Sequence, residues 1–324
     1  MTQQDRISVQ VEDRQLTLSN LSKVLYPEDG FTKAEVLDYY QRISAVLLPH
    51  VTGRPMTLKR YPEGTDGESF FAKHAPDHRP DWVRTEKVES QSSHRSGAGG
   101  RRGVVPPSGQ GRGETVDYVV IDDLPTLMWA ANLAGLELHV PQWRFPRAGE
   151  PEPDLLVFDL DPGAPATIVE CCRVAEALRP LLDEDGLLAL PKTSGGKGLQ
   201  LYARLNIALT AEQASERAKT YAERLEHDRP DLVVSRMTKS LRRGKVLIDW
   251  SQNNGSKTTI APYSLRARTH PTVSTPVTWD EVESCQSPGD LFFTAGDVLS
   301  RVARDGDLLA RLAPGGKGRH FTGR

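Results

Sequence analysis

The sequence predicts an α+β protein, because short strand patterns and capped helices are mixed along one chain. Strands are indicated by short runs that alternate or are uniformly apolar, such as 155–160. Helices are indicated by capping boxes such as Thr32 with Glu35. The predicted strands span residues 7–18 (as a pair), 55–61, 69–74, 136–140, 154–161, 187–191, 199–203, 232–235 and 246–250. The predicted helices span 32–48, 122–133, 167–182 and 211–227, and two short ones begin at Thr278 and Thr294.

Length and composition are those of a globular protein. The chain has 324 residues, a formal net charge of −2 and 38% hydrophobic residues. This length allows one large domain or two modest ones. No apolar run is long enough to span a membrane, and the N-terminus is too polar for a signal peptide. The three cysteines match neither a disulfide framework nor a metal-ligand pattern, which predicts a reducing cytoplasm.

Two segments concentrate positive charge. Residues 235–245 hold five Lys or Arg side chains and no acid, and residues 90–112 hold four arginines and no acid. The second segment is part of a stretch, 90–114, that is rich in Ser, Gly, Arg and Pro and predicts a long flexible loop. Basic patches on a near-neutral protein suit a polyanionic partner. The alternative for either run alone is a solvated charged face.

Paired carboxylates close a buried strand. Asp159 and Asp161 follow an apolar run and precede a Pro-Gly turn. Strand side chains alternate between faces, so both aspartates point the same way. A divalent cation would relieve their repulsion, because Mg²⁺ and Mn²⁺ bind carboxylate oxygens. The alternative is a strand end with two solvated acids. Asp249 ends a second apolar strand and would supply a third ligand.

A Gly-rich turn offers a phosphate site. Residues 193–198 read TSGGKG between two predicted strands, with Ser194 and Lys197 beside backbone N–H groups that can cradle phosphate. The turn is not a Walker A loop, because Gly198 follows Lys197 and Pro191 stands where the leading glycine would be. Alone it is a weak signal. Together with three aspartates and the basic segment, it suits two-metal phosphoryl or nucleotidyl transfer.

The N-terminal part adds an anion site and two aromatics. Lys33 lies in the first turn of a predicted helix, where N–H groups and a cation favour an anion. Asn20 and Lys23 point outward from the preceding loop. Phe70 and Phe71 are adjacent on a strand and face opposite sides. We expect one in the core, and the other exposed where it can stack on a base.

Six motifs, in this order, resemble those of the polymerase domain of bacterial ATP-dependent DNA ligase D, a member of the archaeo-eukaryotic primase superfamily. The motifs are LSNLSKVLYP (18–27), FFAKH (70–74), DDLPTLMWAANLA (122–134), FDLDPG (158–163), TSGGKG (193–198) and DWSQN (249–253). The resemblance runs from about residue 16 to residue 299. It implies a primase-polymerase fold: an RRM-like antiparallel sheet carrying the three aspartates, helices around it, and an N-terminal α/β module that completes the cleft.

The same resemblance implies an activity and partners. It implies a DNA-directed DNA/RNA polymerase of non-homologous end joining that fills gaps, extends DNA ends and prefers ribonucleotides. Its cofactors would be two Mn²⁺ or Mg²⁺ ions, and its substrates nucleoside triphosphates. Its partners would be DNA with gaps or double-strand-break ends bearing a 5′-phosphate, and also Ku and a ligase acting in trans or fused. The expected location is the bacterial cytoplasm, at the nucleoid, with one catalytic domain over 1–305 and a basic Gly-rich tail over 306–324.

Individual roles follow from matching positions in the motifs. The resemblance implies three catalytic and metal-binding residues, namely Asp159, Asp161 and Asp249. The nucleotide-binding positions it implies are Lys59, Phe70, Phe71, His139, Ser194, Lys197, Arg242, Gln252 and Arg266. A pocket for the 5′-phosphate on the downstream side of a gap would comprise Asn20, Lys23 and Lys33.

The chain departs from its relatives in two places. Gln200 stands where many have His, and it can form hydrogen bonds but cannot carry a proton's charge. The loop at 90–114 is longer than usual, in a region that contacts DNA in relatives. The ligase signature Lys-x-Asp-Gly is absent, so we expect a stand-alone polymerase or an excised domain without a ligase core.

Three other functions compete with gap filling. A haloacid-dehalogenase-type phosphatase also places Asp-x-Asp after an apolar strand, but Gly-Thr normally follows, where this chain has Pro162 and Gly163. A non-catalytic module that binds DNA ends would not need all three aspartates. A stand-alone primase is closer, and it is distinguished by whether activity depends on a 5′-phosphate in a gap.

Overall fold

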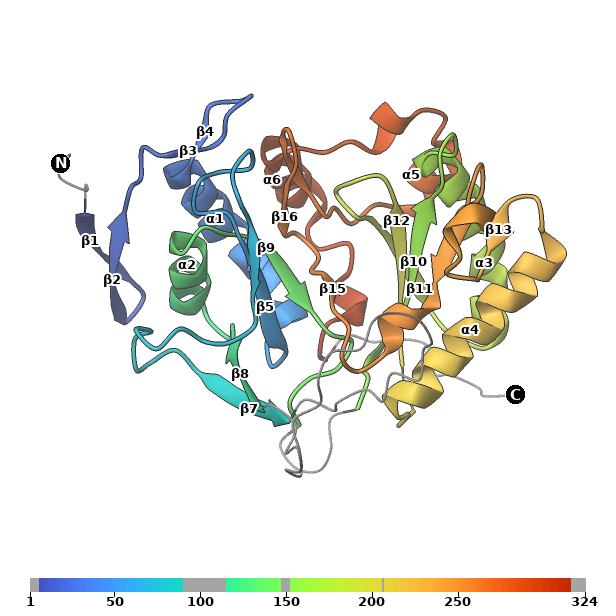
Figure 1. The fold of residues 1–324 in the computed structure, drawn as a ribbon, viewed down its shortest axis with the longest axis horizontal. Helices are drawn as coiled ribbons and strands as arrows, with labels where there is room; N and C mark the ends of the chain where they lie inside the picture. Colours follow the sequence, from blue (N-terminus) through green and yellow to red (C-terminus); the bar gives the residue numbers. More distant parts are fainter. Residues whose placement is uncertain (1–5, 90–114, 147–151, 206, 316–324) are drawn as a thin grey trace, which may run out of the picture.

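A computed structural model of the chain describes residues 6–89, 115–146, 152–205 and 207–315 (Figure 1). The loop predicted at 90–114 and the end of the predicted tail lie outside these residues. Strands and helices are mixed along the described chain and form two sheet-based lobes side by side (Figure 1). This arrangement confirms the predicted α+β class.

The N-terminal lobe is built on a six-stranded antiparallel sheet. Its strands are β5 (Pro55–Arg60), β6 (Phe70–Ala72), β7 (Thr85–Glu89), β8 (Thr115–Val120), β9 (Gly135–Val140) and β15 (Thr259–Ile260). Their order is β15-β9-β5-β8-β7, and β6 pairs with β5. Three two-stranded sheets accompany it, namely β1 (Arg6–Val11) with β2 (Arg14–Ser19), β3 (Val24–Tyr26) with β4 (Phe31–Thr32), and β16 (Leu265–Ala267) with β17 (Pro271–Val273).

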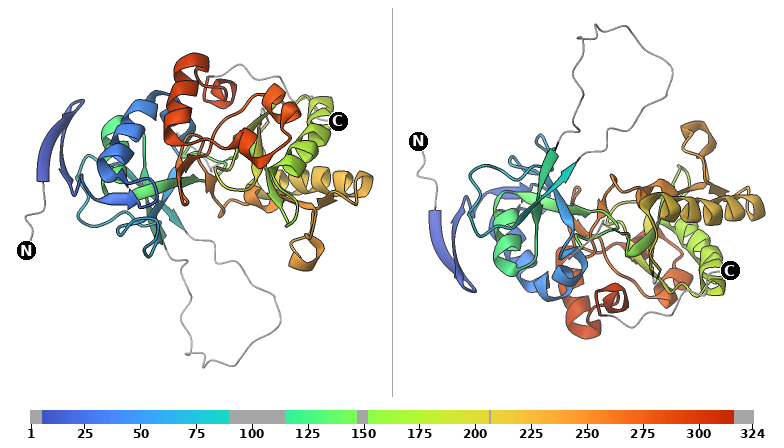
Figure 2. Two further views of the ribbon diagram at one scale, coloured as in Figure 1. Left: turned by 90° about the horizontal axis from the view of Figure 1, so that it is seen from above. Right: turned by 90° about the horizontal axis from the view of Figure 1, so that it is seen from below.

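The helices of this lobe pack on its sheet and on one another. They are α1 (Lys33–Val51), α2 (Leu124–Asn132) and, from the C-terminal part of the chain, α6 (Ala295–Asp305). Capping boxes open α1 and α6 as predicted, and the Asp123 side chain caps α2. A buried hydrogen bond ties helix to sheet, since the Tyr40 hydroxyl donates to the carbonyl of Leu136 (2.6 Å). Figure 2 shows α6 beside α1, so helices from the N-terminal and C-terminal parts of the chain share one core.

The second lobe is built on a five-stranded sheet. Its strands are β10 (Leu155–Pro162), β11 (Ala189–Thr193), β12 (Leu199–Arg204), β13 (Val233–Val234) and β14 (Val246–Asp249). Their order is β11-β12-β10-β14-β13. The pairs are antiparallel, as predicted, except that the short edge strand β13 runs parallel to β14.

Strand alternation separates the two faces of this sheet. The helices α3 (Ile168–Glu184), α4 (Ala211–Asp228) and α5 (Trp279–Ser284) lie on the face that carries Leu156, Phe158 and Leu160 of β10. The side chains of Leu155 and Val157, at the alternate positions of the strand, point to the other face. Asp159 and Asp161 continue this second face towards the N-terminal lobe, so the helices leave the aspartates uncovered.

Two element ends differ from the predictions. Helix α1 continues past Pro49 to Val51, because the N–H of Thr52 still reaches the carbonyl of Leu48 (2.9 Å). The predicted tail begins within packed structure, since Leu309 and Leu312 are buried against β10 and β12. The folded part of the chain therefore continues beyond residue 305. Among the described residues, no helix combines the length and apolar composition that crossing a membrane requires.

Candidate active site

Three aspartates meet on the face of the five-stranded sheet opposite α3, α4 and α5. Asp159 on β10 and Asp249 on β14 are directly opposite each other in an antiparallel pair. Asp161 lies two residues further along β10 and points to the same face. Asp249 is buried, Asp159 half-buried and Asp161 exposed. The group therefore opens from the protein interior towards solvent.

Repulsion among the three carboxylates shifts the pKa values of two of them. Burial and the neighbouring carboxylate of Asp161 raise the pKa of Asp159. Burial and the carboxylate of Asp249 raise the pKa of Asp161. A divalent cation would stabilise the charged forms, because carboxylate oxygens are the ligands that Mg²⁺ and Mn²⁺ prefer. The chemistry of this donor set therefore fits the expected metals.

The carboxylates are not preassembled around an ion position. In the described part of the chain, no three His, Cys, Asp or Glu side chains form a ready metal-binding group. Protein donors engage the oxygens instead. Oδ1 of Asp249 accepts from the N–H (3.0 Å) and hydroxyl (2.5 Å) of Ser251, and its Oδ2 accepts from Nε2 of Gln252 (2.9 Å). Gln252, expected at the nucleotide, thus holds Asp249 in this structure.

The Gly-rich turn packs closely against this site. The Ser194 hydroxyl accepts hydrogen bonds from the N–H groups of Gly196 (3.3 Å) and Gly198 (3.2 Å), which closes the turn on itself. Gly195 has φ +69°, and a Cβ there would lie 2.7 Å from the carbonyl carbon of Val273. Only glycine fits that position without a shift. Lys197 is exposed at the rim, but two of the N–H groups expected to bind phosphate are already bonded to Ser194.

Two arginines approach the aspartates from separate segments. Arg242 and Arg266 both act on Asp161, where their charges oppose the rise in its pKa. Arg242 donates to the carbonyl of Met237 (2.6 Å), within the predicted basic segment. The Nε atoms of both arginines are buried and have no hydrogen-bond partner among the described residues. Unpaired guanidinium donors beside a carboxylate group are suited to a bound phosphate.

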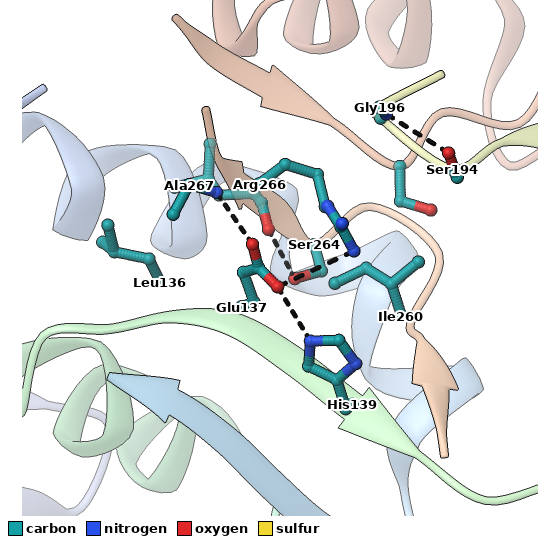
Figure 3. A network of polar contacts seen from close by, with 12 residues as sticks. Leu136, Glu137, His139, Ser194, Gly196, Ile260, Ser264, Arg266 and Ala267 are labelled. Carbon is teal, nitrogen blue, oxygen red and sulfur yellow. Dashed lines mark hydrogen bonds and ion pairs between the residues drawn. The ribbon is translucent and has the colours of Figure 1, made fainter. Parts of the chain in front are cut away.

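A buried carboxylate on β9 contacts two nucleotide-binding candidates, His139 on β9 and Arg266 on β16 (Figure 3). Oε2 of Glu137 accepts from Nε2 of His139 (2.9 Å) and lies 3.7 Å from Arg266, while Oε1 accepts from the N–H of Ala267 (3.0 Å). Burial opposes ionisation, but the His139 hydrogen bond and the Arg266 charge lower the pKa of Glu137 to about 2. Because Nε2 of His139 donates its hydrogen bond to Glu137, neutral His139 presents the lone pair of Nδ1.

The two phenylalanines occupy opposite faces of β6, and both are exposed, so the expectation that one enters the core is wrong. Phe71 lies 5.7 Å from the ring of His139, with Lys59 Nζ 5.5 Å from its centroid. Phe70 instead stacks on the guanidinium of Arg60 (5.2 Å). Lys59, Phe71 and His139 thus form one cluster. Phe70 faces a different surface.

The expected 5′-phosphate residues do come together. The Lys33 N–H donates to the carbonyl of Lys23 (2.8 Å), and the Lys23 N–H donates to that of Asn20 (3.0 Å). The Lys33 side chain is buried and donates to the carbonyl of Ser19 (2.7 Å), rather than pointing outward. Burial, Lys23 and Arg60 lower its pKa to about 8. An anion between these cations would relieve their repulsion.

Sequence reasoning missed three participants. Glu137 shares its strand face with His139, and this alternation is the signal that would have found it. Arg60 neighbours Lys59 but points to the Lys33 side. Lys192 is fully buried beside Gln200, and no pattern in the sequence distinguishes it from a surface lysine.

Comparison with known proteins then identifies the family. The model of the LigD primase-polymerase domain matches residues 32–309. The chain belongs to this family. As a LigD primase-polymerase domain it is a nucleotidyltransferase, and the family is metal-dependent. The solved structure of the polymerase domain from Mycobacterium tuberculosis Ligase D in complex with DNA has a TM-score of 0.80 and 46% identity, over 94% of this chain and 100% of that one.

Whole proteins with this domain are longer. The multifunctional non-homologous end joining DNA repair protein LigD of M. tuberculosis is 47% identical over 306 residues, which are 93% of this chain but 37% of that protein. The bifunctional LigD of Bacillus subtilis is 32% identical over 292 residues, or 90% of this chain and 43% of that protein. The chain therefore spans less than half the length of these relatives.

Proposed function

We propose that this domain joins nucleotides to a DNA 3′ end by two-metal nucleotidyl transfer at gaps and breaks during end joining. The observation that carries the proposal is the convergence of Asp159, Asp161 and Asp249 on one sheet face, with Arg242 and Arg266 beside them. Three acids alone would be destabilising, and cations alone would bind any polyanion. Together they suit a metal-bound triphosphate.

Each group has a task in this chemistry. Asp159, Asp161 and Asp249 would hold Mn²⁺ or Mg²⁺, which supplies charge neutralisation and an acidified 3′-hydroxyl when bound. Arg242 and Arg266 would bind phosphate oxygens through donors that include their buried Nε atoms. Ser194 and Lys197 would contact the triphosphate from the Gly-rich turn. Other residues would hold the base and sugar, namely Lys59, Phe71, His139 and Gln252.

We further propose that the substrate is a gap with a downstream 5′-phosphate. Lys23 and Lys33 lie next to each other in the N-terminal lobe with Arg60 close by, and a phosphate dianion would offset their mutual repulsion. Phe70 stacks on Arg60 and is exposed, so it can contact template DNA on that side. Ribonucleotide preference, Mn²⁺ preference and joint action with Ku and a ligase extend the proposal from the family resemblance.

The family match, the three aspartates and the cations around Lys23 also distinguish the proposed function from the competing ones. Family membership removes the haloacid-dehalogenase reading of Asp159 and Asp161. A non-catalytic module has no need of a buried, repelling carboxylate pair. A stand-alone primase shares the aspartates, and differs only in not needing the cations around Lys23.

Primer extension tests the proposal. A primer facing a 5′-phosphorylated gap is supplied with Mn²⁺ or Mg²⁺ and with ribo- or deoxynucleoside triphosphates in parallel. We expect extension by the wild type and loss of it in Asp159→Ala. Full activity of that variant, or no extension by the wild type, would refute nucleotidyl transfer. Equal activity with and without the 5′-phosphate would favour the primase alternative.

A further inference from the structure

A lysine lies fully buried behind the aspartate group. Lys192 on β11 has 0% of its surface exposed. Its ammonium donates to Oε1 of Gln200 (2.5 Å), to Oγ of Ser274 (2.6 Å) and to the carbonyl oxygen of Ile260 (3.2 Å). An ammonium has three N–H groups, and all three have acceptors here. Burial lowers the pKa of Lys192 well below its usual value, and the nearby charge of Asp159 opposes that lowering. Three acceptors matched to three N–H groups are the pairing that a buried ammonium requires.

The directions of these hydrogen bonds are determined by their neighbours. The Ser274 hydroxyl gives its proton to the carbonyl of Thr193 (3.0 Å), so its oxygen accepts from Lys192. Gln200 Nε2 donates to Oδ1 of Asp159 (2.9 Å), so Oε1 is the atom that faces the ammonium. If the Gln200 amide were flipped, its N–H groups would face the Lys192 ammonium and its oxygen would face the Asp159 carboxylate, and both contacts would be repulsive. The Gln200 amide is therefore held in one orientation.

The sheet register builds this chain of contacts. Lys192 is directly opposite Gln200 in the β11–β12 pair, and Gln200 is directly opposite Asp159 in the β12–β10 pair. Asp159 is in turn opposite Asp249. Side chains at directly opposed positions share one face of a sheet and are nearest neighbours across it. The four residues consequently form a single row across four strands.

We propose that Lys192 is a positioning residue that acts through Gln200 on Asp159. The ammonium orients the amide, the amide N–H holds Oδ1 of Asp159, and Oδ2 is left to face a ligand. Glutamine has no ionisable group, so the amide between Lys192 and Asp159 does not itself titrate, as a histidine at the same position would. The inference rests on the proposed function, in which Asp159 binds a divalent cation.

A double-mutant cycle with Mn²⁺ as the probe tests this relay. Calorimetric titration of the domain without DNA or nucleotide compares the wild type with Lys192→Met, Gln200→Leu and the double variant. Loss of a group that orients a metal ligand costs about 10–100-fold in metal affinity or activity. We expect each single variant to weaken Mn²⁺ binding by that order, and the double variant to be no weaker than Gln200→Leu. Lys87→Met, at an exposed position on β7, is the matched charge control and should bind Mn²⁺ as the wild type does.

The outcomes are separable. Wild-type Mn²⁺ affinity in Lys192→Met would overturn the proposal, and so would losses that multiply in the double variant. If Lys192→Met does not fold, Ser274→Ala removes one acceptor of the ammonium and should also weaken Mn²⁺ binding; unchanged binding would count against the relay. Affinity for a 5′-phosphorylated gap should stay unchanged in every folded variant, because that site lies in the other lobe. If the wild type failed to extend a primer while the Mn²⁺-binding results were as expected, the proposed function would be refuted but the role of Lys192 in positioning Asp159 would stand.

Discussion

Asp159 and Asp249 lie directly opposite each other in the antiparallel β10–β14 pair, on the sheet face opposite α3, α4 and α5. Like charges at such positions destabilise a sheet. Asp161 adds a third carboxylate whose charge interacts with both, and burial raises the pKa of Asp159 and of Asp161. A sheet core gains nothing from this arrangement. Under the proposed function, a divalent cation bound there during the reaction would relieve the repulsion.

Replacing Asp249 with Asn should reduce the repulsion among the three carboxylates, and the melting temperature and the primer-extension activity of Asp249→Asn should show the effect. The variant keeps an oxygen that can accept from Ser251 but loses one negative charge. We expect primer extension to fall by about 100-fold or more, as for a lost metal ligand or its support. The melting temperature without metal, measured near pH 8, should be unchanged or higher. Asp66→Asn, in an exposed turn, should change neither quantity. A destabilised Asp249→Asn would argue for a structural role.

The proposed 5′-phosphate pocket predicts a selective effect of Lys23→Ala. Binding to a 5′-phosphorylated gap should weaken by about 10-fold, the equivalent of one charge-assisted hydrogen bond. Binding to an open primer-template should change far less. The ion pair of Lys23 with Glu63 (2.8 Å) is solvent-exposed and contributes little, so the melting temperature should not move. Equal losses on both DNAs, measured by fluorescence anisotropy, would remove the pocket assignment.

The two phenylalanines should affect different steps. Phe71 touches His139 and Lys59, so Phe71→Ala should raise the KM for the nucleotide by the equivalent of about 1–3 kcal/mol of stacking. Phe70 faces Arg60, so Phe70→Ala should leave that KM unchanged and weaken DNA binding. Each variant serves as the control for the other, because both side chains are exposed and neither supports the core. Identical kinetic effects would contradict the opposite-face assignment.

The depressed pKa of Glu137 predicts an acid-dependent loss of stability. The unfolded chain binds this proton near the ordinary pKa of about 4.3, whereas the folded chain does so at about 2. Stabilisation by Glu137 is therefore complete above that ordinary value and is lost as the pH falls towards 2. Between about pH 5 and pH 3, urea unfolding should show the wild type losing on the order of 1–2 kcal/mol more than Glu137→Gln. Parallel pH profiles would show that Glu137 is not ionised in the fold.

Much of the site could be predicted because its residues lie at strand ends. An apolar run ending in Asp159 and Asp161 predicts a strand, and it also predicts that both aspartates lie on one face of that strand. Both predictions are possible because the alternation of side chains is a local property of the backbone. Capping boxes located the starts of α1, α5 and α6 for the same reason, as each cap involves residues three apart. Local rules did not predict that α1 continues past Pro49 or that Phe70 is exposed. Both features depend on packing against distant segments of the chain.

By itself the sequence determined the α+β class, the Asp159 and Asp161 pair, and the motifs that carry the family resemblance. Tertiary structure alone decided which side chains those motifs meet. Pairing register put Asp249 opposite Asp159 and set Lys192 behind Gln200, and strand alternation turned Phe70 away from His139. These contacts join segments far apart in the chain. No local pattern encodes them, because register and burial depend on the free energy of the whole packed sheet.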